Sequence, residues 1–235
     1  MDYNLLNTDC HSHVLPHIDD GADNAKTSLS MLALLKEQGI DTVFATPHYR
    51  AHREDVKSFY ERRDASARML IEGGYSEDYP NIILGAEVAV EPGLADVKNI
   101  DALTLGNSPY ILLEYPYREY NRRWTEEIEN LVYRYDLTPV IAHLDRYAEL
   151  FTGSDYAEIL QINRAVFQIN NEAFTNRYAK KLVKTLMSDG YPVVLGSDCH
   201  NLDSRMPNFD ISAKKLKSVT PIGEAAKLLR SAVEE

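Results

Sequence analysis

Residues 5–13 read LLNTDCHSH, an apolar start that runs into two histidines spaced two positions apart. We interpret Leu5–Cys10 as a β-strand whose carboxyl end carries His11 and His13. In extended backbone alternate side chains point to the same side, so both imidazoles can reach one site. Six further apolar runs repeat the pattern of a short strand followed by a polar end. They are Thr42–Ala45, Ile82–Leu84, Tyr110–Leu113, Pro139–Ala142, Val166–Ile169 and Pro192–Leu195.

Helical patterns separate these predicted strands. In the first, Leu29, Leu32, Ala33 and Leu35 form an apolar stripe, and Gly39 stands where the helix is expected to end. Later helices are predicted at about Glu54–Glu72, Thr125–Tyr135, Asp155–Asn163, Arg177–Asp189 and Ile222–Val233. Alternating strands and helices predict parallel strands with right-handed crossovers.

Seven such strands indicate an α/β fold with a distorted, seven-stranded (β/α) barrel, although the pattern alone also allows an open sheet. The barrel is expected to be irregular between the third and fourth strands, where helical periodicity is weak. No linker, low-complexity tract or repeat divides the sequence, so residues 1–235 are expected to form a single domain.

Composition limits the classes of function. The chain has 36 acidic and 25 basic side chains and a formal charge of −11, which argues against nucleic-acid binding. No apolar run approaches the roughly 18 residues that span a bilayer, so membrane insertion is not expected. The amino terminus lacks the charge and apolar pattern of a secretion signal. Two cysteines cannot form a disulfide scaffold, which is typical of a cytoplasmic protein.

The candidate site residues follow the predicted strands. Five of the seven histidines lie at or just after a strand's carboxyl end, where the loops of a parallel barrel converge on one site. Carboxylates occupy similar positions, while His17 and His52 are expected to be surface or supporting groups. Each short motif is weak evidence alone, but their repetition on successive strand ends indicates a metal site. The histidines are His11, His13, His48, His143 and His200, and the acids are Asp20, Glu87, Glu114 and Asp198.

The ligand types indicate the kind of metal. Imidazole and carboxylate without thiolate suit Mn²⁺, Fe or Zn²⁺ better than a cysteine-rich zinc site would. With three or four ligands per ion, this set is too large for one ion, so bridging carboxylates are expected to hold two or three. Paired ions are a recurring solution for phosphoester hydrolysis. Arg146 and Arg205 lie within a few residues of expected ligands and suit bidentate binding of phosphate.

The motifs resemble those of the polymerase and histidinol phosphatase (PHP) superfamily. They are DCHSH at residues 9–13, DDG at 19–21, TPH at 46–48, GAE at 85–87, IAHLDRY at 141–147 and SDCHNL at 197–202. Within it, the chain resembles the bacterial manganese-dependent protein-tyrosine phosphatases of the CpsB/YwqE type. Asp20 and Glu114, where other branches often have histidine, favour that branch.

The resemblance implies three divalent ions, expected to be Mn²⁺, with Fe, Zn, Co or Mg as possible substitutes. His11, His13, Glu87 and Asp198 would hold the first ion. Glu87, Glu114 and His143 would hold the second, and Asp20, His48 and His200 the third. A metal-bridging hydroxide would attack phosphorus directly, while Arg146 and Arg205 hold or polarise the phosphate. Asp20 is a further candidate catalytic residue, and the sequence leaves open whether it or another carboxylate assists the leaving group. The implied substrate is phosphotyrosine, on the Tyr-rich tail of a bacterial tyrosine kinase that controls capsular or exopolysaccharide synthesis.

Rival functions remain open from the sequence. A PHP phosphoesterase acting on histidinol phosphate or a nucleotide is the main alternative. Cys199 and Arg205 match the Cys-x5-Arg spacing of cysteine-dependent phosphatases, but the segment between them has no glycine and Asp203 would repel phosphate. An amidohydrolase would be expected to add a lysine at a mid-barrel strand end, and none is predicted here. A metal-dependent binding module would not require both arginines.

Overall fold

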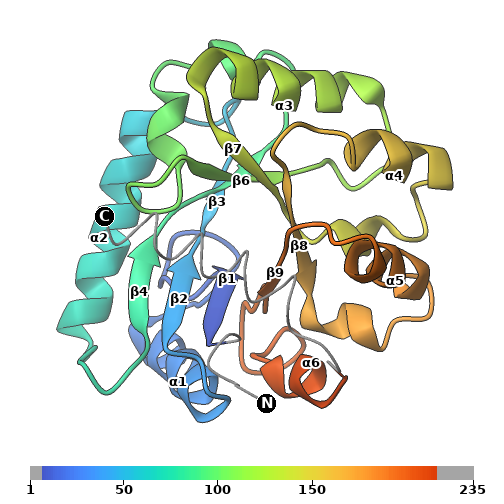
Figure 1. Ribbon diagram of the computed structural model, residues 1–235. Coiled ribbons are helices and arrows are strands. Elements are labelled where there is room, and N and C mark those ends of the chain that lie inside the picture. The colour runs from blue at the N-terminus through green and yellow to red at the C-terminus, as the bar shows by residue number, and fades with distance from the viewer. Residues whose placement is uncertain (1–6, 216–235) are drawn as a thin grey trace.

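Two parallel β-sheets form the centre of the structure (Figure 1). The computed structural model describes residues 7–215. The first sheet has the order β1-β2-β4 and the second has the order β3-β5-β6-β7-β8-β9. The strands are β1 (Thr8–Ser12), β2 (Thr42–Ala45), β3 (His48–Tyr49), β4 (Asn81–Leu84), β5 (Glu87–Ala89), β6 (Tyr110–Glu114), β7 (Thr138–Ile141), β8 (Val166–Asn170) and β9 (Val193–Gly196).

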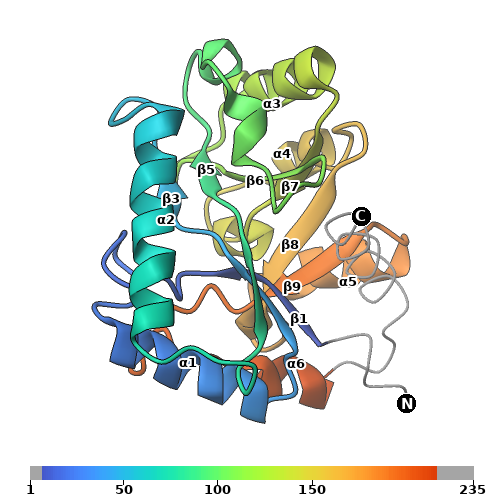
Figure 2. The ribbon, with the colours of Figure 1, turned by 90° about the vertical axis from the view of Figure 1, so that its left-hand side faces the viewer.

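Helices surround the two sheets, with α2 along one side, α3 at the top of Figure 1, α4 and α5 opposite α2, and α1 and α6 at the bottom. Figure 2 shows α2 running upright beside the strands. The α-helices are α1 (Ala25–Glu37), α2 (Val56–Glu72), α3 (Arg122–Tyr135), α4 (Gly153–Ile159), α5 (Lys180–Ser188) and α6 (Phe209–Lys215). Short 3₁₀ turns are η2 (Leu94–Asp96), η3 (Ile100–Leu103), η4 (Leu144–Tyr147) and η5 (Asn171–Phe174).

Local sequence explains where the first helices begin and end. The Asn24 side chain accepts a hydrogen bond from Thr27 N at 2.9 Å and caps α1. Asp55 caps α2 in the same way through Ser58 N at 2.8 Å. Gly39 follows α1 with φ of 87°, a left-handed conformation that glycine adopts without a steric penalty. The predicted end of the first helix is therefore confirmed.

The predicted α/β class with parallel strands is confirmed, but a closed seven-stranded barrel is not, because the described strands pair as two sheets. Only Thr46 and Pro47 separate β2 from β3, and Gly85 and Ala86 separate β4 from β5. Pro47 has no N–H to donate to a strand ladder. A Cβ on Gly85 would lie 2.7 Å from Leu105 Cδ2, so a larger residue there would require the Leu105 side chain to shift. The strands are interrupted at these two positions, and β3 and β5 pair in the second sheet rather than the first.

Contacts between β1 and β9 join the two sheets. Ser12 forms an isolated parallel bridge with Cys199, and His13 N donates to Cys199 O at 3.0 Å. Asp198 N donates to His11 O at 2.8 Å. The carboxyl ends of the first and last strands are therefore held side by side.

The buried core forms two clusters. The larger one lies between the strands and the surrounding helices and includes Leu32, Phe59 and Leu131. The smaller one combines residues from both sheets, namely Cys10, Phe44, Leu105, Leu112, Val140, Ala142, Val166 and Val194. Burial of these side chains fixes the strands and thereby the loops that follow them.

The elements match most sequence predictions, with boundaries shifted by a few residues. The start of the first predicted strand, Leu5 and Leu6, and the predicted helix Ile222–Val233 lie outside the described residues. The short strands β3 and β5 and the helix α6 were not predicted. As predicted, the segment between β4 and β6 has little α-helix; it contains β5, η2 and η3.

Candidate metal centre

All nine predicted ligands lie at strand ends or in the loops that follow them. His11 belongs to β1, His48 to β3, Glu87 to β5 and Glu114 to β6. His143 follows β7, whereas Asp198 and His200 follow β9. His13 follows β1, and Asp20 lies in the loop between β1 and α1. His48 and Glu87 are the first residues of β3 and β5, so each comes just after the carboxyl end of the preceding strand, β2 or β4, which parallel pairing places beside the carboxyl end of β1.

Glu87 lies at the centre of the cluster. Its Oε2 lies 3.4 Å from His11 Nε2, 3.3 Å from His13 Nε2 and 2.8 Å from His48 Nδ1. Its Oε1 lies 2.8 Å from His143 Nε2. Glu87 Oε2 is nevertheless a buried oxygen that forms no hydrogen bond with any described residue. A carboxylate surrounded by nitrogens in this way fits a bridging metal ligand.

Four overlapping groups of candidate ligands form around Glu87, and two of them include it. Asp198 Oδ1 lies 3.6 Å from His11 Nε2 and 3.5 Å from His13 Nε2. Asp20 Oδ1 lies 3.2 Å from His48 Nε2 and 3.5 Å from His200 Nε2. Within each of four groups, one ligand atom per residue lies within 4.8 Å of the others. These groups are His13, Asp20, His48 and His200; His11, Glu87 and His143; His11, His13 and Asp198; and His48, Glu87 and Glu114.

Two hydrogen bonds determine how His11 and His13 present their nitrogens. His11 Nδ1 lies 3.0 Å from Gln168 Oε1, and His13 Nδ1 lies 2.7 Å from Asp19 Oδ2. Both partners are acceptors, so each Nδ1 carries the proton and a neutral ring leaves its Nε2 free to accept. The two Nε2 atoms lie 3.1 Å apart. Two unprotonated nitrogens repel at that distance, so a cation, either a proton or a metal ion, is needed between or beside them, and the donor set fits a metal ion in place of the proton.

The backbone is strained where two ligands leave their strands. His143 has φ of 29° and Asp198 has φ of 50°, values that residues with a Cβ rarely adopt. Glycine is required nearby, since a Cβ on Gly196 would lie 2.7 Å from both His11 Cβ and Gln168 Nε2. The packing therefore holds these ligands in uncommon conformations.

Charge in the metal-free cluster is unevenly distributed. Burial opposes ionisation of Glu87, but the neighbouring histidines outweigh it and hold the Glu87 pKa well below its usual value. Burial, followed by the charge of Glu87, raises the pKa of Glu114 to about 7. Burial also lowers the pKa of His13, but Asp19 and Glu87 together outweigh this effect and raise it to about 9. For His48, Asp20 and Glu87 outweigh burial and raise the pKa to about 11. Protons thus occupy sites that a metal ion would take.

Arg146 and Arg205 both reach Asp198. Arg146 Nη2 donates to Asp198 Oδ2, and Arg205 Nη2 donates to Asp198 Oδ1 at 2.8 Å. Arg146 Nη1 also lies 3.7 Å from Glu114 Oε1. Both arginine side chains are about one-third exposed, at 30% and 36%. They lie between the buried ligands and solvent, where a phosphate group would approach.

Cys199 lies in the apolar core and is fully buried. Burial, with added repulsion from Asp9, raises the pKa of its thiol well above the usual value. A nucleophilic cysteine needs the opposite, an accessible thiolate with a lowered pKa. The structure therefore argues against the cysteine-dependent alternative.

The family follows from the sequence comparison. Residues 7–233 match the model of the family described as capsular polysaccharide synthesis, CpsB/CapC. This chain belongs to the CpsB/CapC family. The resemblance to the CpsB/YwqE type is therefore confirmed.

Individual CpsB/CapC proteins are moderately similar to the chain. The tyrosine-protein phosphatase YwqE of Bacillus subtilis is 28% identical over 84% of this chain and 78% of its own length. The tyrosine-protein phosphatase CpsB of Streptococcus pneumoniae is 28% identical over 88% of this chain and 90% of its own. Crystal structures described as YwqE and CpsB, unique metal-dependent tyrosine phosphatases, give a match with a TM-score of 0.76 and 25% identity. That match covers 96% of this chain and 94% of the matched chain.

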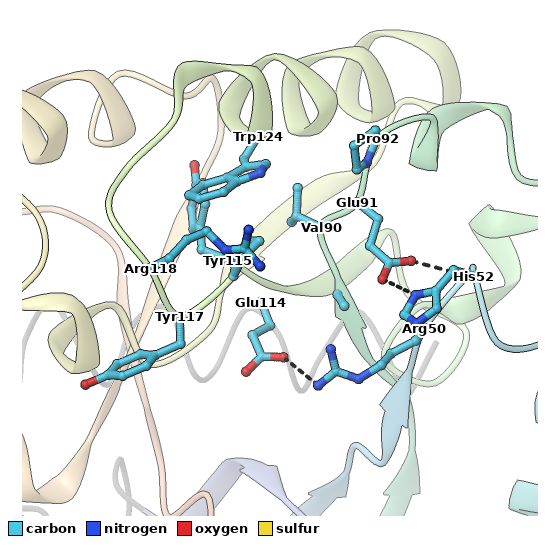
Figure 3. Close-up of a pocket in the computed structure, with 12 residues that line it drawn as sticks. Arg50, His52, Val90, Glu91, Pro92, Glu114, Tyr115, Tyr117, Arg118 and Trp124 are labelled. Atoms are coloured by element: carbon cyan, nitrogen blue, oxygen red, sulfur yellow. Dashed lines mark hydrogen bonds and ion pairs between the residues drawn. The ribbon is translucent and has the colours of Figure 1, made fainter.

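Two cavities open beside the cluster of this CpsB/CapC protein. The first, the Trp124 cavity, has a volume of about 540 Å³ and includes Glu114, Tyr117, Arg118 and Trp124 (Figure 3). The second, the arginine cavity, has a volume of about 430 Å³. It is lined by Ile18, Asp19, Asp20, His48, Arg50, Arg53, Glu54 and Arg62. Arg50 lines both cavities, and each cavity contains at least one predicted ligand.

Sequence analysis missed the groups that orient the ligands and line the cavities. Gln168 is a polar residue inside an otherwise apolar strand, which is a signal of a buried hydrogen bond. Asp19 stands directly before Asp20, but nothing in the sequence shows which of them contacts His13. Arg50 and Arg53 follow β3 without a motif. His17 and His52 are exposed, as predicted, and His52 forms an ion pair with Glu91.

Proposed function

We propose that this chain hydrolyses phosphotyrosine on proteins with a cluster of three divalent metal ions. The observation that carries the proposal is the central position of Glu87, buried among His11, His13, His48 and His143 without a hydrogen bond to its Oε2 from the described residues. Tyrosine phosphatase activity in the relatives CpsB and YwqE supports the choice of reaction.

The overlapping groups around Glu87 support an assignment of the nine ligands to three ions. We assign His11, His13, Glu87 and Asp198 to the first, and Glu87, Glu114 and His143 to the second. Asp20, His48 and His200 are assigned to the third. This division follows the contacts of Asp198 with His11 and His13, and those of Asp20 with His48 and His200.

The proposed physiological metal is Mn²⁺, since the ligands are imidazole and carboxylate groups, which also suit Fe, Zn, Co or Mg. When bound, the ions would activate water as the nucleophile and neutralise charge on the phosphoryl oxygens. The metal-dependent relatives YwqE and CpsB support a need for metal.

The arginines are proposed to bind the phosphate. Each guanidinium can donate two parallel hydrogen bonds to phosphoryl oxygens, so Arg146 and Arg205 would orient phosphorus and stabilise negative charge as the P–O bond breaks.

Asp20 is the third residue proposed to act in catalysis. Its close contacts with His200 and His48 hold its pKa well below the usual value, so it stays ionised. Phenolate leaves with a pKa near 10 and depends less on a protonated acid than an alkoxide does.

The Trp124 cavity is the proposed site for the tyrosine ring. It borders Glu114 and contains aromatic side chains and guanidinium groups, which suit an anionic aryl group. The substrate is proposed to be the Tyr-rich tail of a bacterial tyrosine kinase that acts in capsular or exopolysaccharide synthesis. The CpsB/CapC family description supports that process.

The proposed location is the cytoplasm, where such a tail would be accessible. The two cysteines, Cys10 and Cys199, form no disulfide and are buried. Between residues 7 and 215, no helix combines the length and hydropathy that a bilayer crossing requires.

We also propose that residues 1–235 form one domain and that its strands make a distorted seven-stranded barrel. In this view β2 with β3, and β4 with β5, each count as one interrupted strand. The Ser12–Cys199 bridge and the cluster of Phe44, Leu112 and Val194, which draws on both sheets, support this view.

Hydrolysis of a phosphotyrosyl peptide by metal-stripped protein, with and without Mn²⁺, tests the function. Wild type, Cys199→Ser and His11→Ala are compared, and metal content is measured for each. Activity that requires metal, survives Cys199→Ser and is lost in His11→Ala supports the proposal. Activity that persists with chelator and disappears in Cys199→Ser contradicts it. Turnover of histidinol phosphate or a nucleotide with a higher kcat/KM than the peptide contradicts the proposed substrate alone.

A further inference from the structure

Three arginines line the arginine cavity, together with the three carboxylates Asp19, Asp20 and Glu54, in a chain whose formal charge is −11. Arg50, Arg53 and Arg62 line it, while Asp20 and His48 of the ligand cluster form another part of its wall. A strongly acidic protein repels an acidic substrate at long range, so local positive charge is needed where such a substrate binds. The cavity therefore matches a negatively charged group next to the reacting phosphate.

The cavity's carboxylates already have partners. Asp19 accepts from His13, and Asp20 lies near His48 and His200. Glu54 binds Arg62 through two contacts, at 2.5 Å and 3.0 Å. Arg62 also donates to Ile18 O at 2.7 Å, which fixes it in the wall.

Arg50 and Arg53 have guanidinium groups that are available to bind a ligand. The side chain of Arg53 is exposed and forms no hydrogen bond or ion pair with any residue between 7 and 215. Arg50 has one charged partner in this part of the chain, Glu114 at 3.9 Å, near the limit for an ion pair. Both guanidinium groups can therefore bind an anion without breaking a strong existing contact.

The turn that carries these arginines is held in place. Arg53 N donates to Arg50 O at 2.9 Å, which closes the turn after β3. His52 N donates to Glu91 Oε2 at 3.2 Å, and the His52 ring also binds Glu91. These contacts tie the turn to the segment after β5, so the spacing of Arg50 and Arg53 is set before a ligand binds.

We propose that the arginine cavity binds the carboxylate of an Asp or Glu that lies close to the phosphotyrosine in the substrate protein. This inference rests on the proposed function and names the substrate class that the site selects. Arg50 borders both cavities, so a chain with its phosphotyrosine ring in the Trp124 cavity can place a neighbouring residue in the arginine cavity. A carboxylate can accept hydrogen bonds from the planar guanidinium groups. Arg53 is the specificity-determining residue of this subsite.

The test uses the Mn²⁺-loaded enzyme and a set of phosphotyrosyl peptides. A parent peptide has Gln at the two positions on either side of phosphotyrosine, and each derivative replaces one Gln by Glu. We expect one Glu position to raise kcat/KM about threefold to fivefold, the scale of an exposed ion pair. Arg53→Gln removes this preference while kcat/KM for the parent peptide and for p-nitrophenyl phosphate stays unchanged.

Arg68→Gln is the matched control. Arg68 is exposed on α2 and does not line the cavity, so this variant loses the same charge and keeps the preference. Arg53→Glu reverses the preference, so that Lys is favoured over Glu at the same peptide position. These results support the inference, and the preference should weaken as salt is added.

Other outcomes overturn it. Equal kcat/KM for all peptides in the wild type overturns the acidic subsite but leaves the proposed function intact. A Glu preference that is equally strong in Arg53→Gln and Arg68→Gln assigns the selection to another surface and also overturns it. Failure of the wild type to hydrolyse any phosphotyrosyl peptide overturns the proposed function together with this inference.

Discussion

Gln168 contacts two candidate ligands from β8, a strand that contributes no candidate ligand itself. Its Oε1 accepts from His143 N at 2.6 Å and lies 3.0 Å from His11 Nδ1. Its Nε2 donates to Asn170 Oδ1 at 2.9 Å, which fixes the orientation of the amide. A buried amide in this position sets the tautomer of His11 and the place where the chain leaves β7.

Gln168→Met keeps the length of this side chain and removes its acceptor. We expect Mn²⁺ affinity to fall about 10–100-fold, because His11 is no longer held with Nε2 facing the cluster. Titration of metal-stripped protein in a metal buffer measures the change. Gln161→Met, an exposed change in the loop before β8, is the control and leaves the affinity unaltered. Equal affinity of both variants would show that Gln168 does not orient His11.

Substitution of Arg205 tests whether its guanidinium binds the phosphate or only supports the proposed ligand Asp198. We expect Arg205→Ala to lower kcat/KM by about 10²–10³-fold, the effect of losing a donor to transition-state charge. Arg205→Lys restores part of the loss, since lysine keeps the charge but not the planar fork. Metal content, measured in parallel, stays at the wild-type level. Loss of metal in both variants would instead give Arg205 a structural role beside Asp198.

At the scale of elements, β9 and β1 approach each other closely because residue 196 has no side chain. Gly196→Ala would place a Cβ 2.7 Å from His11 Cβ and from Gln168 Nε2. We expect the free energy of unfolding to fall by about 1–3 kcal/mol, as in other overpacked cores. Urea unfolding of metal-stripped protein measures it. Gly153→Ala is the control, because no atom lies within 4 Å of a Cβ there, and it should not destabilise the protein.

Element lengths explain which parts of the fold the sequence predicts. Runs such as Thr42–Ala45 and Tyr110–Leu113 are apolar and bounded by polar residues, so periodicity locates them. The strands β3 and β5 have two and three residues, too few for a period, and Pro47 and Gly85 interrupt the runs before them. The helix α6 was also missed, although α4, which has the same length of seven residues, was predicted.

The candidate site likewise contains residues that the sequence predicts and residues that it does not. His11, Glu87 and Asp198 were predicted because each follows a recognisable strand, and parallel strands bring such positions together. Contacts between distant segments have no such pattern: Gln168 reaches His11 across 157 positions. Arg50 borders two cavities only because the turn after β3 packs against the segment after β5. Sequence therefore predicts which candidate ligands come together better than it predicts the residues that orient them.

At the scale of the whole molecule, the ligand cluster lies where the two sheets meet. His11 comes from the first sheet, whereas Glu87 and Glu114 come from the second. A bound ion would connect both sheets and balance the carboxylates between them. We expect chelator to lower Tm and added Mn²⁺ to restore it in a concentration-dependent way, because a ligand that binds only the folded state stabilises it. A Tm that is independent of Mn²⁺ would contradict a shared site.

Metal loading should also release protons, and the pKa values give the direction. In the metal-free protein His13, with a pKa of about 9, and His48, with a pKa of about 11, are protonated at pH 7.5. Metal binds unprotonated imidazole, so both protons must leave, together with part of one from Glu114, whose pKa is about 7. Above pH 9 most His13 side chains are already unprotonated in the metal-free protein. Mn²⁺ therefore binds more tightly there, and its binding releases fewer protons.

Calorimetric titration with Mn²⁺ in buffers of different ionisation enthalpy measures the number of protons. We expect more protons to be released per chain at pH 7.5 than at pH 9.5, because His13, with a pKa of about 9, is mostly unprotonated at the higher pH before metal binds. Asp19→Asn removes the charge that raises the His13 pKa, so its proton release at pH 7.5 should be smaller than that of the wild type. Release that does not change between these pH values would show that His13 is unprotonated before metal binds, and His13 would then not be the group that links metal affinity to pH.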